Sequence, residues 1–155
     1  MQKKPLVVQL FVLLLAISFC GVAQSKSGCT VASSSMAFGA YNPASSANVD
    51  VIGSVGVRCN PPANVKVSVG VGNGAGARYS TGRKMTRMAG GGTLTYNLYL
   101  DSARTVVLGD GTDGSTFWNV TGHKLTFDIF GRIPGSQPTV QAGSYVDTVI
   151  VTVSY

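Results

Sequence analysis

The C-terminal segment from Asp147 to Tyr155 alternates without interruption between two sets of mainly β-branched residues. This period of two predicts a half-buried β-strand. The residues expected on one face of the strand are Val149, Val151, Val153 and Tyr155. A sandwich normally covers both edges of such a strand, and the sequence offers no strand after Tyr155. We therefore expect the second edge to be covered either by an earlier strand or by another polypeptide.

Residues 1–23 have the features of a cleaved signal peptide. Two lysines lie near the start, Leu6–Phe19 is almost continuously apolar, and Gly21–Ala23 supplies the small residues that a signal peptidase recognises. The alternative is a lipoprotein anchor at Cys20, although the preceding residue is bulky where that processing needs a small one. No later stretch is long and apolar enough to span a bilayer. We therefore predict an exported protein with one mature domain, residues 24–155, and no integral membrane segment after cleavage.

The mature sequence has the composition of strands and turns. Glutamate is absent, and Gly, Ser, Thr and Val are abundant. Alternating residues predict strands at 49–59, 65–71 and 93–100, with a further short strand at 105–108, and the first of these is expected to end at Asn60-Pro61-Pro62. About seven short strands separated by turns, without convincing helical periodicity, predict an all-β sandwich.

Two cysteines, Cys29 and Cys59, remain once the signal peptide is removed. An even number of cysteines in an exported chain predicts a disulfide, which stabilises a loop of this length by about 3–4 kcal/mol on the chain-entropy model. Two buried free thiols are the alternative. Metal binding lacks further ligands, because His123 is the only histidine and there is no second cysteine pair. We therefore expect no metal and no cofactor.

The charge pattern and the missing motifs argue against two broad classes of function. The chain has a formal net charge of +6, but its basic residues are scattered and not interleaved with aromatic ones, so we expect no binding of nucleic acid. There is no Gly-x-Ser-x-Gly motif, His123 stands alone, and the aspartates lie mostly in predicted turns. We therefore predict no catalytic residues and no enzyme activity.

One basic cluster and one tryptophan are candidates for surface binding. The cluster contains Arg78, Arg83, Lys84 and Arg87, and Trp118 is the only tryptophan. A solvated strand face is the favoured interpretation of the cluster, and a site for an anion or a surface is the alternative. Trp118 is interpreted as a core residue, although a tryptophan can also stack on a sugar. A carbohydrate- or surface-binding adhesin module is therefore a less favoured hypothesis.

Several short motifs follow one another along the whole mature chain. They are Cys29-Thr-Val, Phe38-Gly-x-Tyr41, Cys59, Leu94-Thr-Tyr-Asn-Leu-Tyr-Leu-Asp101, Ala103-Arg104, Gly109-Asp-Gly111, Phe130-Gly-Arg-Ile-Pro134, Gln137 and Gly143-Ser-Tyr-x-Asp-Thr148. Each motif is weak alone, but together and in this order they are specific. With these motifs the chain resembles the spore coat protein U domain family.

The resemblance implies a fold and a role. The family includes subunits of archaic chaperone–usher pili of Gram-negative bacteria, as well as spore-coat and surface proteins. Its pilin members have an immunoglobulin-like sandwich that lacks its final strand. A periplasmic chaperone supplies this strand during export, and the N-terminal extension of the next subunit replaces it at assembly. We therefore expect an incomplete immunoglobulin-like β-sandwich, with Val149, Val151, Val153 and Tyr155 along its strand-accepting groove or edge.

The resemblance also implies partners and a location. The expected partners are a periplasmic pilus chaperone, an outer-membrane usher and other pilus subunits, in a surface fibre that serves attachment and biofilm formation. Shaft subunits carry a donor strand ahead of the first cysteine, whereas Gln24–Gly28 is short and polar, so we expect a subunit that accepts a strand but does not donate one. The alternative is a self-complete spore-coat or cell-surface matrix protein.

Overall fold

The computed structural model describes residues 28–155, which contain strands, turns and loops but no helix. The all-β prediction is thereby confirmed for this part of the chain. The predicted signal peptide, residues 1–23, and the alternative anchor at Cys20 lie outside the described residues. Within the described part, no helix is long and apolar enough to cross a membrane.

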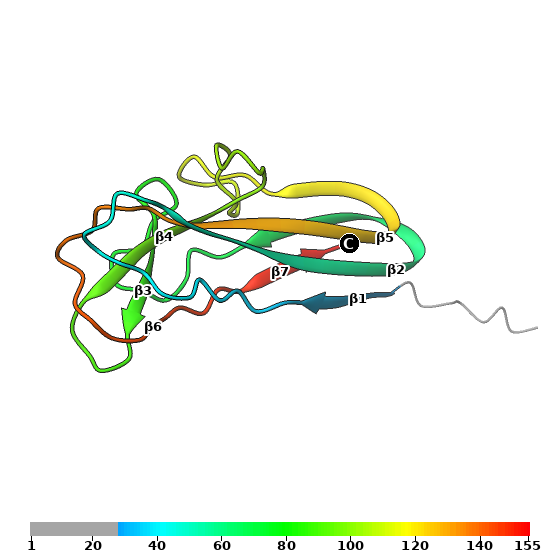
Figure 1. Cartoon of the computed structure of the whole chain (residues 1–155). Helices are drawn as coiled ribbons and strands as arrows, with labels where there is room; N and C mark the ends of the chain where they lie inside the picture. Colours follow the sequence, from blue (N-terminus) through cyan, green and yellow to red (C-terminus); the bar gives the residue numbers. More distant parts are fainter. Residues whose placement is uncertain (1–27) are drawn as a thin grey trace, which may run out of the picture.

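Seven strands make up the fold (Figure 1). They are β1 (Gly28–Ser33), β2 (Val49–Val69), β3 (Arg83–Arg87), β4 (Thr93–Tyr99), β5 (Trp118–Ile133), β6 (Tyr145–Val146) and β7 (Val151–Ser154). Neighbouring strands pair in the order β1-β2-β5-β4-β3-β6, and β7 pairs with β2 away from this path. All of these strand pairs are antiparallel.

The long strands β2 and β5 form the frame of the fold. They pair antiparallel over residues 49–58 and again over residues 63–67 of β2, with a shift of register between the two stretches. Figure 1 shows that both strands curve back together at one end of the molecule. One continuous sheet therefore folds over on itself and encloses the core between its two halves.

Two predictions about strand ends are wrong. The Asn60-Pro61-Pro62 segment does not end a strand, because the prolines lie at the register shift, where their missing N–H groups interrupt no hydrogen bond to β5. The stretch 105–108 forms no regular strand, because residues 105 and 106 belong to a turn and only Val107 and Leu108 make isolated β-bridges, to Tyr99 and Thr116. There the Asp101 carboxylate accepts hydrogen bonds from the amides of Thr105 (3.0 Å) and Val106 (2.8 Å).

The first and the last strand share one edge of β2. β1 pairs with residues 55–60 of β2 and β7 pairs with residues 66–69, while β5 occupies the opposite edge. A disulfide joins Cys29 in β1 to Cys59 in β2 at directly opposite positions, which confirms the predicted bridge. Neither β1 nor β7 has a strand on its second edge within the described residues.

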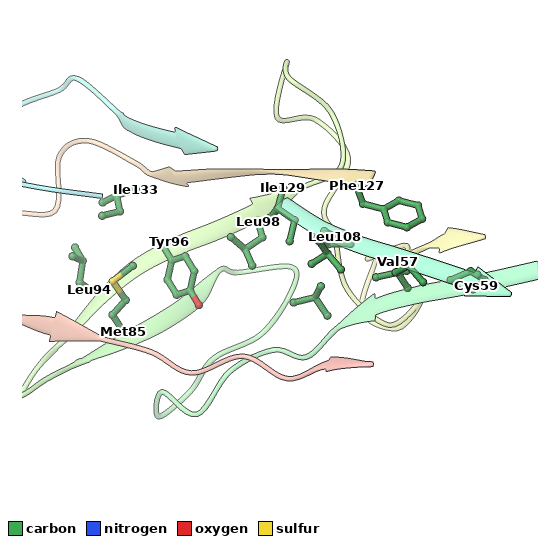
Figure 2. Close-up of a cluster of buried hydrophobic side chains, with 14 residues drawn as sticks. Val57, Cys59, Met85, Leu94, Tyr96, Leu98, Leu108, Phe127, Ile129 and Ile133 are labelled. Carbon is green, nitrogen blue, oxygen red and sulfur yellow. The ribbon is translucent and has the colours of Figure 1, made fainter. Parts of the chain in front are cut away.

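The core is formed mainly by side chains of β2, β3, β4 and β5 (Figure 2). Its buried members are Val55, Val57, Cys59, Val65, Val67, Val69, Met85, Leu94, Tyr96, Leu98, Leu108, Phe127, Ile129 and Ile133. Val149, Val151 and Val153 of the C-terminal segment pack against this core but are only partly buried. Burial is therefore complete for the core side chains of β2 to β5 and partial for those of the C-terminal segment.

Candidate functional site

An open groove with a volume of about 1160 Å³ separates the chain that follows β1 from the chain around β6 and β7. We call residues 33–41 its first wall, and residues 140–149 with Val151 its second wall. Core side chains form the floor, namely Val55, Met85, Leu94, Tyr96, Leu98, Ile129 and Ile133. The groove therefore lies over the apolar core, between the first and last parts of the fold.

The first wall leaves the β1–β2 ladder and is held near its two ends. At the start, the Ser34 amide donates to the Ser54 carbonyl (3.0 Å). At the far end, the Tyr41 hydroxyl donates to the Pro134 carbonyl (2.9 Å). Between these points, residues 35–40 make no backbone–backbone hydrogen bond to any other described segment. The backbone of this wall is therefore free to pair.

Two glycines of the β2–β5 pair make room for the apolar side chains of the first wall. A Cβ at Gly53 would lie 2.5 Å from Met36 Cγ. A Cβ at Gly131 would lie 2.7 Å from Met36 Cε and 2.8 Å from Phe38 Cζ. The Phe38 ring also meets the Tyr96 ring edge-on, with 5.9 Å between centroids. These contacts seat the first wall on the sheet through its side chains and leave its backbone unpaired.

The second wall changes its pairing partner along its length. Tyr145 and Val146 form β6 and pair with β3, whereas β7 begins at Val151 and pairs with β2. Residues 147–150 belong to no strand, although the Ile150 carbonyl accepts a hydrogen bond from the amide of a β2-flanking glycine (2.8 Å). In the described chain each strand of this wall is paired along one edge only. The wall therefore presents an unpaired backbone edge beside the groove.

Some apolar side chains near the groove are more exposed than the residues paired with them in the sheet. Val31 lies opposite Val57 in the β1–β2 ladder, and residues paired in this way point to the same face. Nevertheless Val31 is 48% exposed and Val57 only 2%. Val149 and Val151 are likewise only partly buried. Within the described residues these side chains therefore remain only partly covered.

One polar contact joins the groove floor to the second wall. The buried Tyr96 hydroxyl donates to Asp147 Oδ2 (2.7 Å), and Figure 2 shows this hydroxyl directed toward the final segment of the chain. Burial and the hydrogen bond raise the pKa of Tyr96, so the phenol stays protonated and remains a donor. The pair is not predicted from the sequence, because 51 positions separate its members. The one signal for it is that both residues lie within the motifs that carry the family resemblance.

The structure divides the four residues predicted to line the groove. Val149 and Val151 lie in the second wall. Val153 pairs with Val67 and packs against the core, and Tyr155, which follows β7, is 61% exposed. Contact of any of these residues with a donated strand stays a prediction.

Arg83 does not belong to a solvated face, so this interpretation of the basic cluster is wrong for Arg83. The residue is 0% exposed because it lies on the inner face of β3, as alternation places it with the buried Met85. Its guanidinium donates to Asn97 Oδ1 (2.7 Å) and to the carbonyls of Val69, Gly70 and Leu108. Burial lowers the pKa of Arg83. Its role is to tie β3 to β4 and to the end of β2.

The other surface candidates make local contacts. Lys84 Nζ donates to a threonine hydroxyl of β4 (2.6 Å), and Arg87 Nε donates to the Ala142 carbonyl (2.9 Å). Trp118 is half-buried and packs against the core, with 5.1 Å between its ring centroid and that of Phe127. The part of the chain that the structure describes holds no cluster of His, Cys, Asp and Glu suited to a metal ion. Surface or sugar binding by these side chains stays a prediction.

The fold is similar to that of a chain in the crystal structure of the CsuC–CsuE chaperone–tip adhesion subunit pre-assembly complex, from archaic chaperone–usher Csu pili of Acinetobacter baumannii. The TM-score is 0.58 and the identity 22%, and the similarity covers 84% of this chain and 40% of that chain. The chain therefore spans less than half the length of this structural neighbour. The similarity confirms the predicted pilin-like β fold.

The sequence itself has a curated relative. "Protein U" of Myxococcus xanthus is 27% identical over 144 residues, which cover 88% of this chain and 77% of that protein. The family model of the Spore Coat Protein U domain matches residues 14–152, which is most of the chain. The open groove, the disulfide and the motif order thus occur in a chain that belongs to the Spore Coat Protein U domain family.

Proposed function

We propose that this chain is an exported structural subunit of a surface fibre and that its groove accepts a β-strand from another polypeptide. The observation that carries the proposal is the groove, in which two backbone edges without partners in the described residues flank a floor of core side chains. Such a groove leaves backbone groups unpaired and apolar side chains of the walls only partly buried. A strand supplied by another chain satisfies both at once, which is the physical basis of β-augmentation.

The expected energetics favour a long-lived complex. A strand in the groove would direct every second side chain onto the floor. Burying about five apolar side chains at ~1.5–3 kcal/mol each contributes roughly 8–15 kcal/mol before the costs of ordering are subtracted. Backbone hydrogen bonds to the two walls add about 0.5–1.5 kcal/mol each. This sum is large enough to hold successive subunits of a fibre together.

The similar proteins indicate which partners to expect. The structural neighbour is part of a complex between a chaperone and a tip adhesion subunit of archaic chaperone–usher pili. By analogy, we infer that a periplasmic chaperone, an outer-membrane usher and other pilus subunits are partners of this chain. We further infer that the assembled fibre lies at the cell surface, serves attachment and biofilm formation, and has no catalytic role.

A second candidate function is that of a coat or matrix protein that needs no foreign strand. The similarity to Protein U, within a family named for a spore coat protein, favours this candidate. It requires a sandwich that covers its own final strand. Within residues 28–155 that cover is missing, which favours strand acceptance.

Thermal unfolding of the mature protein with its disulfide intact tests the proposal. The probe is a synthetic peptide of about ten residues, roughly the length of a groove wall, with Val or Leu at every second position. A peptide of the same composition in shuffled order is the control. We expect the alternating peptide to raise the unfolding midpoint by at least about 5 °C and the shuffled peptide to leave it unchanged.

Two matched variants locate the effect in the groove. Val151 lines the second wall, whereas its neighbour Ile150 is 71% exposed and is not among the lining residues. We expect Val151→Asp to abolish the shift caused by the peptide and Ile150→Asp to preserve it. A high midpoint that no peptide changes would show that the sandwich is already complete, and would favour the coat-protein function.

A further inference from the structure

The carboxylate of Asp147 holds the second wall where strand pairing is interrupted. Between β6 and β7, residues 147–150 belong to no strand. Asp147 Oδ1 accepts hydrogen bonds from the amides of Asn73 (2.9 Å) and Thr148 (2.8 Å). Its Oδ2 accepts the hydrogen bond from the Tyr96 hydroxyl (2.7 Å). One carboxylate thus joins the wall to the groove floor and to the turn after β2.

The turn after β2 leaves room for this carboxylate at a glycine. Gly72 has a φ of +95°, and a Cβ at this position would collide with the side chain of Asp147. Any other residue would be strained at Gly72 and would displace the carboxylate. Gly76 lies in the same loop with a φ of +73°, but a Cβ there would meet no atom within 4 Å. Gly76 is therefore a control with similar backbone strain and no collision.

The charge of Asp147 also acts on the interior. Arg83 is fully buried, and its hydrogen-bond partners, the Asn97 side chain and three backbone carbonyls, are all neutral. Burial lowers the pKa of Arg83, and Tyr96, Tyr79, Asp147 and Asp110 act against this lowering. Asp147 is thus one of several groups that favour the charged form of the buried Arg83.

We propose that Asp147 is a positioning residue of the groove, which fixes the second wall where a donated strand can pair with it. This inference rests on the proposed function of the groove. Asp147 acts through the backbone of residues 147–150, because its carboxylate is already bound by Tyr96 and the Gly72–Asn73 turn. Strand pairing alone orders little of the wall, since β6 pairs at two positions and β7 at four.

Binding kinetics of the alternating peptide to the mature protein test the inference. Asp147→Asn keeps the shape of the side chain but removes its charge, and Tyr96→Phe removes the hydroxyl donor. We expect each variant to weaken binding about tenfold, mainly through slower association, because the wall must first become ordered. We expect the double variant to be no weaker than either single variant, because both changes disrupt the same contact.

Matched controls separate this effect from general loss of stability. Asp128 and Tyr99 lie outside the groove lining, so Asp128→Asn and Tyr99→Phe should bind within about twofold of the wild type. Gly72→Ala displaces the carboxylate without replacing any residue of the groove walls, and it should weaken binding as Asp147→Asn does. Gly76→Ala should not, although it introduces similar backbone strain. This second pair of variants applies even where Asp147→Asn fails to fold.

The outcomes distinguish this inference from the proposed function. Equal binding by the wild type and Asp147→Asn would overturn the inference and leave strand acceptance intact. Equal losses in Gly72→Ala and Gly76→Ala would also overturn it, because strain alone would then explain them. If the wild type binds the alternating peptide no better than the shuffled one, the proposed function fails, and this inference fails with it.

Discussion

β2 and the second wall are built from similar sequences but differ in how completely they are buried. Val65, Val67 and Val69 alternate along β2 and are all 0% exposed. Val149 and Val151 alternate in the same way and remain partly exposed. The difference lies in their neighbours, because β5 pairs with this part of β2 up to Val67 and β7 pairs with it from Lys66 to Val69, so that the two partners overlap on opposite edges. The second wall has a strand on one edge only in the described chain.

The comparison shows what alternation specifies and what it does not. It determines which face of a strand a side chain occupies, and it leaves open whether anything covers that face. In β2 the rest of the chain supplies the cover. At the groove the cover is missing, and we place the function there. Substitutions in β2 and at the groove should therefore differ in how much they destabilise the domain and in which property they change.

The largest expected effect is in β2. Val67→Asp places a carboxylate where exposure is 0%, and should destabilise the domain by at least about 4 kcal/mol. Val151→Asp makes the same change in the partly exposed wall and should cost only about 1 kcal/mol. Chemical denaturation of both variants without peptide, followed by circular dichroism, measures the contrast. Equal losses would show that the second wall is as complete as β2.

The disulfide should have the next largest effect, because it ties β1 and the first wall to the frame. Its two cysteines are 30 positions apart in the sequence. Replacing both of them, Cys29→Ser with Cys59→Ser, should lower the free energy of unfolding by about 3–4 kcal/mol. Urea denaturation of the oxidised wild type and the double variant measures this loss. A loss below about 1 kcal/mol would mean that the β1–β2 ladder alone holds the first wall in place.

Replacing Arg83 should destabilise the folded domain by a smaller amount. Arg83→Lys keeps the charge but cannot reach the carbonyls and Asn97 together, so it should cost about 2–3 kcal/mol. Arg87→Lys is the matched control, because the bonds of Arg87 lie at the surface, and it should cost less than about 0.5 kcal/mol. Denaturation curves of the two variants provide the comparison. Similar costs at both positions would contradict a structural role for burial of the Arg83 guanidinium.

The smallest expected effect depends on pH and lies on the outer face of the frame. Arg132 donates two hydrogen bonds to Asp50 (2.7 and 2.8 Å) and lowers the pKa of its carboxyl. A carboxyl with a lowered folded pKa contributes stability above its unfolded pKa of about 3.9, and this contribution is lost as the pH falls through the folded value.

Because the Asp50–Arg132 pair is partly exposed, Asp50→Asn should cost less than about 1 kcal/mol near neutral pH. The cost should vanish at a pH well below the folded pKa of Asp50, where the wild-type carboxyl is also neutral. Denaturation of both proteins as a function of pH checks this. A cost that persists in acid would have to arise from a lost contact other than the ion pair.

The elements that follow from local pattern could be predicted from the sequence. Alternation predicted the strands that became parts of β2, β4 and β7, and the paired cysteines predicted the disulfide. The prolines at 61 and 62 led to the wrong prediction that a strand ends there, because a bend with a register shift tolerates them in a continuous strand. The prediction that Arg83 lies on a solvated face was wrong, because a charged side chain on an alternating strand normally indicates the solvent-exposed face.

The walls of the groove could not be predicted, because they depend on contacts between distant segments. The side chains of Met36 and Phe38 fit over glycines of β2 and β5, and no local sequence pattern predicts such a fit. The contact between Tyr96 and Asp147 likewise joins separate motifs. Which members of the final alternation reach the groove depends on where the wall changes from β3 to β2.

Backbone amide hydrogen exchange of the mature protein, with and without the alternating peptide, tests the central claim most directly. We predict that the peptide protects amides of residues 35–40 in the first wall and of residues 147–150 in the second wall together, while protection within β2 and β5 changes little. The shuffled peptide should protect neither wall. Protection confined to one wall, or bound peptide that protects neither wall, would contradict the claim that the groove accepts a strand between its two walls.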